Sequence, residues 1–172
     1  TQEFFDTTQT GLNSLSLAPK IVSTGGTPNL KNLGLLDGAT EHRSGTSIFN
    51  DRMMMVAGVA NINDCALTVY TSMVSQAEDT RGILDAGSKT LTPDTGGLDG
   101  FGLVLEHPNA RIHKMAEEHG FIDISNCKSR PSIGDIFRIV PNHVCVVVNM
   151  FDQLVAVRSN HIVDVIPVDA RG

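Results

Sequence analysis

The chain has 172 residues, of which 41% are hydrophobic and 19% are charged, and its formal net charge is −6. This length and apolar content can bury a substantial core, and they predict about one to one and a half domains. A negative chain lacks the basic footprint that phosphate backbones attract, so we expect no nucleic-acid partner. A small, charged metabolite fits this composition.

Three cysteines, Cys65, Cys127 and Cys145, occur without a CxxC spacing. Their odd number argues against a disulfide framework and is typical of a reducing compartment, so we expect the cytoplasm. No apolar run approaches the ~20 residues that a membrane-spanning helix needs, and no signal-peptide pattern opens the chain, so we expect no membrane partner. The sequence begins with Thr1 rather than Met, and we expect its true start to be missing.

The first part of the chain is typical of the end of an α/β unit. Residues 1–19 are polar and weakly periodic, as in a loop or the tail of a helix. Residues 20–22 have strand character, and the STGG stretch that follows predicts a turn. A second short strand or loop is expected within residues 40–51.

The middle of the chain predicts a change to β-structure. Residues 52–65 begin helical, and a β-branched, apolar run from Ala66 onward favours a strand. A short strand near residues 81–87 precedes a loop rich in Gly, Pro and Asp. Residues 109–119 are expected to be helical, with Gly120 as the C-terminal stop.

The last forty residues predict three or four strands. Turn signals separate them at residues 141–142, 150–153 and 159–160. The segment 139–157 reads as buried β-structure, and it carries a histidine and a cysteine two positions apart.

His143 and Cys145 are the clearest candidate metal ligands. Side chains alternate faces along a strand, so on the predicted strand both would project to the same side. Imidazole and thiolate suit Zn²⁺, and two protein ligands would leave positions for water or substrate, as in a catalytic site. The alternative is that His143 caps a turn and Cys145 is an ordinary buried thiol.

The stretch STGGTPN, residues 23–29, is a candidate phosphate site. Its two glycines allow backbone amides to approach an anion closely. Further hydroxyl donors are Ser23, Thr24 and Thr27. A plain glycine-rich turn is the alternative.

Two other sets are weaker candidates. His113 and Glu117 lie four positions apart on the predicted helix, but HKMAEEH has the charge density of a solvated face. Lys89 could form a Schiff base, although an ordinary surface role fits a loop lysine better.

Seven sequence blocks follow one another along residues 20–172: STGGTPN, EHRSGTSIFND, ILDAGSKTLTPDTG, GFGLVLEHPNA, EEHGFIDIS, RPSIGDIFRIVPNHVCVVVNMFD and VIPVDARG. Their order resembles the D-threonine aldolase and D-serine dehydratase family. That family is similar to alanine racemase, with a pyridoxal-phosphate barrel followed by a β-domain. The resemblance implies that residues 1–50 are an α/β barrel remnant, the last strands of a TIM-type barrel. It implies that residues 51–172 are a mainly β, metal-binding domain.

The resemblance also implies site residues. The residues that the resemblance assigns to the phosphate of pyridoxal 5'-phosphate are Ser23, Thr24, Gly25 and Gly26. Those that it assigns to a divalent metal beside the cofactor are His143 and Cys145. With Cys in the second position, the chain looks more like the zinc-containing dehydratases than the aldolases, which favours zinc over manganese.

Two departures from the family pattern are visible. Many relatives have Tyr where this chain has Ser47, which puts the substrate preference in doubt. The family's Schiff-base lysine lies near the start of its barrel, and no lysine of this chain matches its motif. The resemblance therefore implies a C-terminal fragment whose catalytic lysine lies outside this chain.

The function that the resemblance implies is a lyase dependent on pyridoxal phosphate and a divalent metal, acting on D-β-hydroxy amino acids. The reaction is a dehydration or an aldol cleavage, and neither the catalytic base nor the physiological substrate is assigned. The resemblance also implies a homodimer, or association with the missing N-terminal half. Two alternatives stay open: a non-catalytic, β-rich interaction or dimerisation domain, and a metal-free amino-acid racemase.

Overall fold

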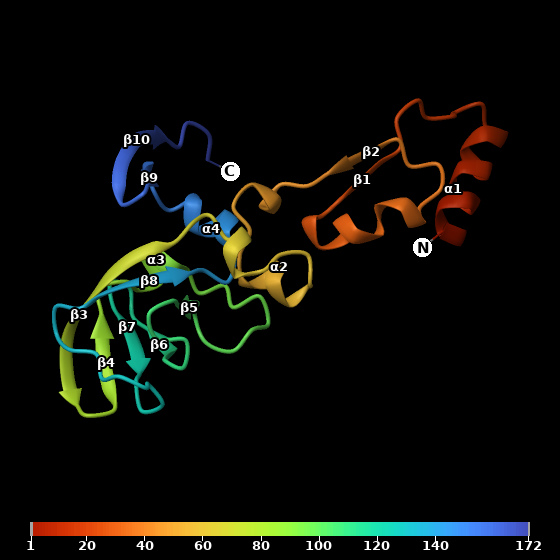
Figure 1. Cartoon of the computed structure of the whole chain (residues 1–172). Helices are drawn as coiled ribbons and strands as arrows, with labels where there is room; N and C mark the ends of the chain where they lie inside the picture. Colours follow the sequence, from red (N-terminus) through yellow and green to blue (C-terminus); the bar gives the residue numbers. More distant parts are fainter. Residues whose placement is uncertain (1, 172) are drawn as a thin grey trace.

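The computed structural model describes residues 2–171; Thr1 and Gly172, the outer ends of the two predicted domains, lie outside the described residues. An elongated arm extends away from a β-rich body (Figure 1). The arm begins with α1 (Gln2–Ser14), so of the two structures expected for residues 1–19 the helix is the one formed.

The arm also contains a two-stranded parallel sheet of β1 (Ser23–Gly25) and β2 (Glu41–Arg43). The strand that the sequence predicts at residues 20–22 lies instead at Ser23–Gly25, in the stretch predicted to form a turn. Gly26, with φ +100°, ends the strand and leads into η1 (Thr27–Leu35).

Short helices connect the arm to the body. They are η2 (Thr46–Ile48), α2 (Arg52–Val56) and η3 (Ile62–Asp64). The helical start predicted at residue 52 is confirmed, and Asp51 caps α2 by accepting a hydrogen bond from the amide of Met54.

Six antiparallel strands form the sheet of the body, in the order β5-β8-β3-β4-β7-β6. Their bounds are β3 (Val69–Glu78), β4 (Arg81–Leu84), β5 (Leu103–Val104), β6 (Arg111–Met115), β7 (Gly120–Asp123) and β8 (Ile136–Val140). The amide of Phe101, just before β5, donates to the carbonyl of Ile112 in β6, so the two ends of the sheet meet and the sheet is nearly closed. The strands predicted from Ala66 and near residues 81–87 are confirmed as β3 and β4.

The core lies inside this curved sheet. Seven large apolar side chains of its strands belong to the core cluster and are at most 1% exposed: Met73, Leu84, Val104, Ile112, Ile122, Phe137 and Ile139. A short helix, α3 (Ser88–Leu91), follows β4 and contributes Leu91 to the same cluster.

The helix predicted over residues 109–119 is wrong, because this segment forms β6 and the turn into β7. Its Lys, Met, Ala and Glu residues favour a helix locally, but pairing with β7 and burial of Ile112 outweigh that preference. Gly120 does not stop a helix. It begins β7, where a Cβ would lie 2.7 Å from the carbonyl oxygen of Ala86.

The prediction of β-structure over residues 139–157 is also wrong for the middle of that segment. After β8 the chain forms α4 (Val144–Val148) instead. Val144 and Val147, three positions apart on one helix face, are each 1% exposed, so a run of β-branched residues is held as a helix by the core that it fills.

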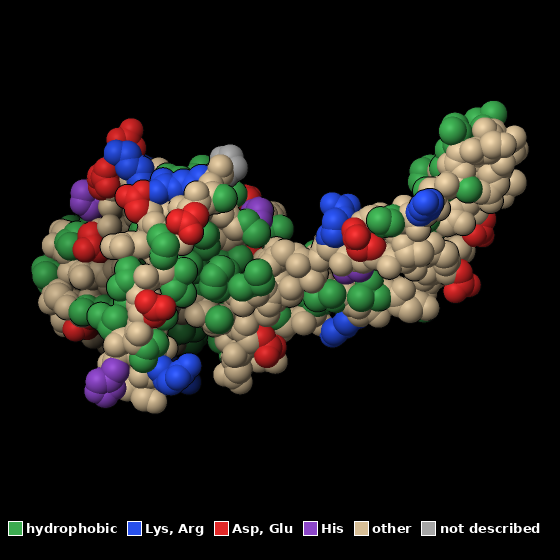
Figure 2. Space-filling model, turned by 90° about the horizontal axis from the view of Figure 1, so that it is seen from above, with side chains coloured by type: hydrophobic (Ala, Val, Ile, Leu, Met, Phe, Trp, Pro, Cys, Tyr) green, Lys and Arg blue, Asp and Glu red, His purple; other side chains and the backbone are tan. Residues whose placement is uncertain are grey.

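The chain ends in a hairpin of β9 (Gln153–Arg158) and β10 (His161–Pro167). The turn predicted at residues 159–160 is confirmed, and both of its residues have positive φ. Large apolar side chains stay exposed on this hairpin and on the arm, where Figure 2 shows hydrophobic side chains gathered at the far end. Within residues 2–171, no helix combines the length and the apolar character needed to cross a membrane.

Candidate functional site

The first turn of α4 is anchored by a buried carboxylate. Asp51 is 0% exposed, and its Oδ1 accepts from the amide of Met54 while its Oδ2 accepts from the amide of Val144, both at 2.9 Å. One side chain therefore caps both α2 and α4. The residue that precedes Val144 is His143, so Asp51 helps to fix where this histidine leaves the backbone.

His143 meets a residue from a distant loop. Its Nδ1 lies 2.6 Å from Oδ2 of Asp94, which is 49 positions away in the sequence. The hydrogen bond with His143, together with one from the amide of Gly96, holds the pKa of Asp94 below its ordinary value. Asp94 thus connects the loop after α3 to the candidate ligand His143.

Cys145 is the second residue of α4, and its side chain is exposed. Its Sγ is 3.5 Å from the hydroxyl oxygen of Thr46, which lies on η2. Cys65 and Cys127 are partly buried, and burial raises the pKa of their thiols, which disfavours the thiolate form that binds metals.

The geometry of the candidate pair differs from the sequence prediction. His143 is the extended residue before α4 and Cys145 belongs to the helix, so the two do not share a strand face. The two residues are still separated by only one position, at the start of α4. Across residues 2–171, no cluster holds three or more His, Cys, Asp or Glu side chains arranged for a metal. The chain thus offers two candidate ligands here.

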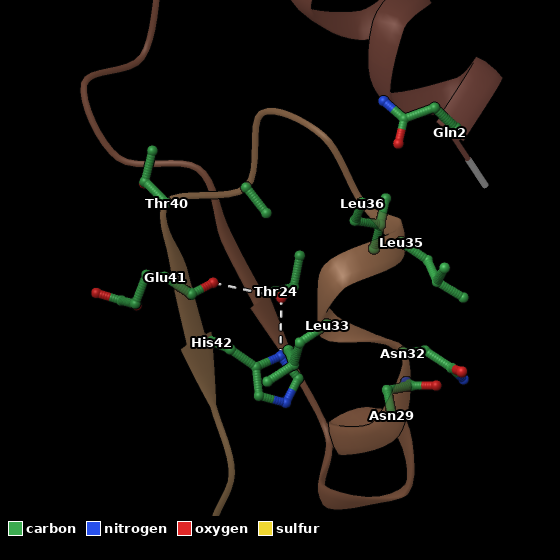
Figure 3. Close-up of a pocket in the computed structure, with 12 residues that line it drawn as sticks. Gln2, Thr24, Asn29, Asn32, Leu33, Leu35, Leu36, Thr40, Glu41 and His42 are labelled. Carbon is green, nitrogen blue, oxygen red and sulfur yellow. Dashed lines mark hydrogen bonds between the residues drawn. The ribbon is translucent and has the colours of Figure 1, made fainter.

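The candidate phosphate residues lie on the arm, beside a hollow of about 610 Å³. Figure 3 shows this hollow between the two arm strands and η1, with Thr24 and His42 facing each other. Gly25 also lines it, together with Leu33 and Leu36 of the η1 region.

Several of the predicted phosphate donors are already hydrogen-bonded within the arm. The Ser23 hydroxyl donates to Glu41, the Thr24 hydroxyl lies 2.8 Å from Nδ1 of His42, and the Gly26 amide donates to the Arg43 carbonyl at 3.0 Å.

Two other polar atoms in this region are unpaired. Oγ1 of Thr27 and Nε2 of His42 are buried, and neither has a hydrogen-bond partner within the described part of the chain. Buried polar atoms are normally paired, so this part of the arm suits a polar ligand group.

The two sets of candidate residues lie in different parts of the molecule. Thr24 and Gly25 belong to the arm, whereas α4 packs against the body (Figure 1). Sequence reasoning missed Asp51 and Asp94. The first could be suspected from its position as an N-cap before a helical run, but no local pattern points from Asp94 to His143.

Lys89 and the pair His113 and Glu117 behave as surface residues. Lys89 lies 2.6 Å from Glu118, and this hydrogen bond raises the pKa of Lys89, the opposite of what a Schiff-base lysine needs. His113 lies on β6 and Glu117 in the turn after it, so they do not share a helix face.

Comparison with known proteins identifies the family. A family model described as a putative serine dehydratase domain matches residues 66–157, more than half of the chain. The chain belongs to this family. The resemblance inferred from the ordered motifs is thereby confirmed.

Relatives in the serine dehydratase family differ in length. An uncharacterized protein of Mycobacterium tuberculosis is 33% identical over 130 residues, which are 73% of this chain and 98% of that protein. The D-serine dehydratase of Dictyostelium discoideum is 32% identical over 167 residues, 87% of this chain but 42% of the enzyme. The chain thus spans less than half of that enzyme and nearly all of the shorter relative.

Solved structures of the family have the same fold. The D-threo-3-hydroxyaspartate dehydratase of Delftia sp. HT23 is 28% identical, with a TM-score of 0.82 over 94% of this chain and 47% of its own. An alanine racemase-like protein of Idiomarina loihiensis, 24% identical over 92% of this chain and 46% of its own, has a TM-score of 0.81 and shows the fold alone. Two further structures of D-threo-3-hydroxyaspartate dehydratase carry alanine in place of a histidine and in place of a cysteine two positions later. The second is described as the metal-free form.

Proposed function

We propose that the chain is the metal-binding part of a lyase that depends on pyridoxal phosphate and acts on D-β-hydroxy amino acids. The observation that carries the proposal is the pair His143 and Cys145 at the start of α4, where His143 directly precedes the helix and Cys145 lies within it. Its spacing equals that of the histidine and cysteine replaced in the dehydratase structures. Membership of the serine dehydratase family supports the reaction class.

A divalent cation would be held by Nε2 of His143 and Sγ of Cys145. The donor set fits, because nitrogen and thiolate sulfur suit zinc. Manganese is the alternative that the family resemblance leaves. Two protein ligands leave positions for water and for a substrate hydroxyl. Thr46, 3.5 Å from Sγ, would orient the thiolate through its hydroxyl.

The cofactor phosphate would be held on the arm, by the segment from Ser23 to Gly26. The unpaired Thr27 hydroxyl and His42 Nε2 support this assignment, because phosphate oxygens accept hydrogen bonds from hydroxyl and imidazole donors. Gly26 adds room, since a Cβ there would meet nothing closer than 3.7 Å.

The cofactor and the metal supply distinct chemistry when bound: an electron sink for a carbanion, and a Lewis acid for a β-hydroxyl. The chain's own residues bind and orient these groups. We place the Schiff-base lysine outside this chain, because no lysine of the chain matches the family's motif and Lys89 is paired with Glu118 at the surface.

We also propose that the arm is the end of a TIM-type barrel completed by another polypeptide segment, with the domain boundary near residue 50. Parallel strands occur almost only in sheets covered on both faces, yet β1 and β2 stand as an exposed pair. The barrel's other half or a second copy in a homodimer would cover them. The unpaired cysteines fit a reducing compartment, which we take to be the cytoplasm.

The test is metal content together with turnover. Intact protein, including the segment that carries the Schiff-base lysine, is assayed for metal by plasma emission, and its dehydration or cleavage of D-serine, D-threonine and D-threo-3-hydroxyaspartate is followed with added cofactor and metal. We expect close to one zinc per chain, lost in His143→Ala and in Cys145→Ala. Equal zinc in the wild type and both variants would overturn the assignment.

A second candidate function is a free-standing, non-catalytic module. The short Mycobacterium relative favours it, because the match covers 98% of that protein, so nearly all of it corresponds to part of this chain. Intact mass separates the two: a protein no larger than this chain, without zinc and without turnover, supports the module.

A further inference from the structure

The loop of residues 92–102, between α3 and β5, contacts the candidate metal ligand His143. Asp94 of this loop contacts His143 through Oδ2, at 2.6 Å from Nδ1. Its other oxygen, Oδ1, accepts from the amide of Gly96 at 2.9 Å. One oxygen of the Asp94 carboxylate is thus fixed by its own loop, and the other contacts the imidazole of His143.

The direction of this hydrogen bond decides which imidazole nitrogen is available. An ionised carboxylate can only accept, so Nδ1 of His143 must carry the proton and donate to Asp94. In a neutral imidazole the lone pair then lies on Nε2. The contact therefore selects one tautomer and fixes the plane of the ring.

The contact adds little to folding. The His143 side chain is 30% exposed and the Asp94 side chain 41%, and partly exposed ion pairs contribute little stability because water and salt screen them. A loop residue held in this way acts mainly on the orientation of the histidine.

We infer that Asp94 is a positioning residue for the metal site, which holds His143 with Nε2 directed to the cation and strengthens cation binding. This inference rests on the proposed function. Asp94 is not itself placed as a ligand, because both of its oxygens are engaged by Gly96 and by the ring. Carboxylates that accept from a metal-bound histidine orient the ring and raise its basicity as a ligand.

The experiment measures Co²⁺ binding to the full chain by the thiolate-to-cobalt absorption band, which reports Cys145 directly. Loss of such a partner typically weakens metal binding about 10- to 100-fold, and we expect this for Asp94→Ala. Asp94→Asn keeps an acceptor oxygen, so its affinity should lie between those of the wild type and Asp94→Ala.

A matched control comes from the same loop. Asp99 carries the same charge but pairs with Arg111, at 2.7 Å from its Nε, and within the described residues the side-chain partner of His143 is Asp94 instead. Asp99→Asn should leave the Co²⁺ affinity unchanged, which separates the positioning effect from a general loss of negative charge.

A second readout needs no metal. Nitrogen-15 NMR of the imidazole should show the proton on Nδ1 of His143 in the wild type and a mixture of tautomers in Asp94→Ala. Circular dichroism of the variants verifies that the fold is retained.

The outcomes separate this inference from the proposed function. If the wild type binds Co²⁺ and Asp94→Ala binds it equally well, or if the tautomer does not change, the positioning role is refuted while the metal site stands. If the wild type binds no Co²⁺, or His143→Ala binds it as the wild type does, the metal assignment and this inference are both overturned.

Discussion

Replacing Asp51 by Ala should test how the two short helices are held. The carboxylate is fully buried and accepts two backbone hydrogen bonds, from Met54 and Val144. Its loss leaves two buried amides without partners, and each unpaired buried group costs about 1–3 kcal/mol. Because the surrounding chain relaxes in part, we expect a total loss of about 2–4 kcal/mol in the free energy of unfolding.

The loss is measurable by chemical and thermal unfolding followed by circular dichroism. For a chain of this size it corresponds to a fall in Tm of roughly 4–16 °C. The matched control is Asp79→Ala, because that carboxylate is 90% exposed and pairs with Arg130 at the surface. Such a pair contributes about 0–1 kcal/mol.

Amide hydrogen exchange locates the effect. In Asp51→Ala the amides of Met54 and Val144 should exchange faster than in the wild type, and Co²⁺ binding should weaken because the turn that carries His143 loosens. The reasoning is refuted if Asp51→Ala is no less stable than Asp79→Ala, or if these two amides keep their protection.

Three further predictions concern the backbone, acid stability and the cofactor. A Cβ at Gly87 would lie 2.4 Å from the carbonyl oxygen of Glu117, so Gly87→Ala should lose about 1–3 kcal/mol in urea unfolding, whereas Gly34→Ala, with nothing within 4 Å, should not. Partial burial alone would raise the pKa of Asp85, but hydrogen bonds from β3 outweigh it and hold the pKa below its ordinary value of 3.8. Because the pKa is lowered in the folded state, ionised Asp85 stabilises the fold above pH 3.8, and this stability is lost as the pH falls through the folded-state pKa. Acid unfolding of Asp85→Asn should therefore lack this loss of stability, and an acid transition identical to that of the wild type would contradict the prediction. Borohydride treatment of the chain with pyridoxal phosphate should leave no stoichiometric adduct on its lysines by mass spectrometry, and such an adduct would place the Schiff-base lysine within this chain.

The predicted fold is correct where local pattern and final contacts agree. Residues 69–78 combine β-branched and apolar side chains, and they form the longest strand of the sheet. The turn at Ser159 and Asn160 follows from residue types that tolerate positive φ. The prediction fails over residues 109–119, where local helix preference is opposed by pairing with a strand that the sequence alone does not align.

The candidate site was likewise predictable from the sequence in part only. The spacing of His143 and Cys145 is visible in the sequence, but their backbone conformation is not, because the buried carboxylate of Asp51 and the packing of Val144 convert a strand-like run into a helix. The contact of Asp94 with His143 joins residues 49 positions apart, and no periodicity records it.

The sequence by itself determined the negative charge, the ligand types, their spacing and the ordered motifs that mark the serine dehydratase family. Only the tertiary structure decided which segments become strands or helices and which side chain meets His143. The physical reason is that local preferences differ by about 1 kcal/mol or less per residue. Core packing and buried hydrogen bonds between distant residues contribute more than this, so they decide wherever the two disagree.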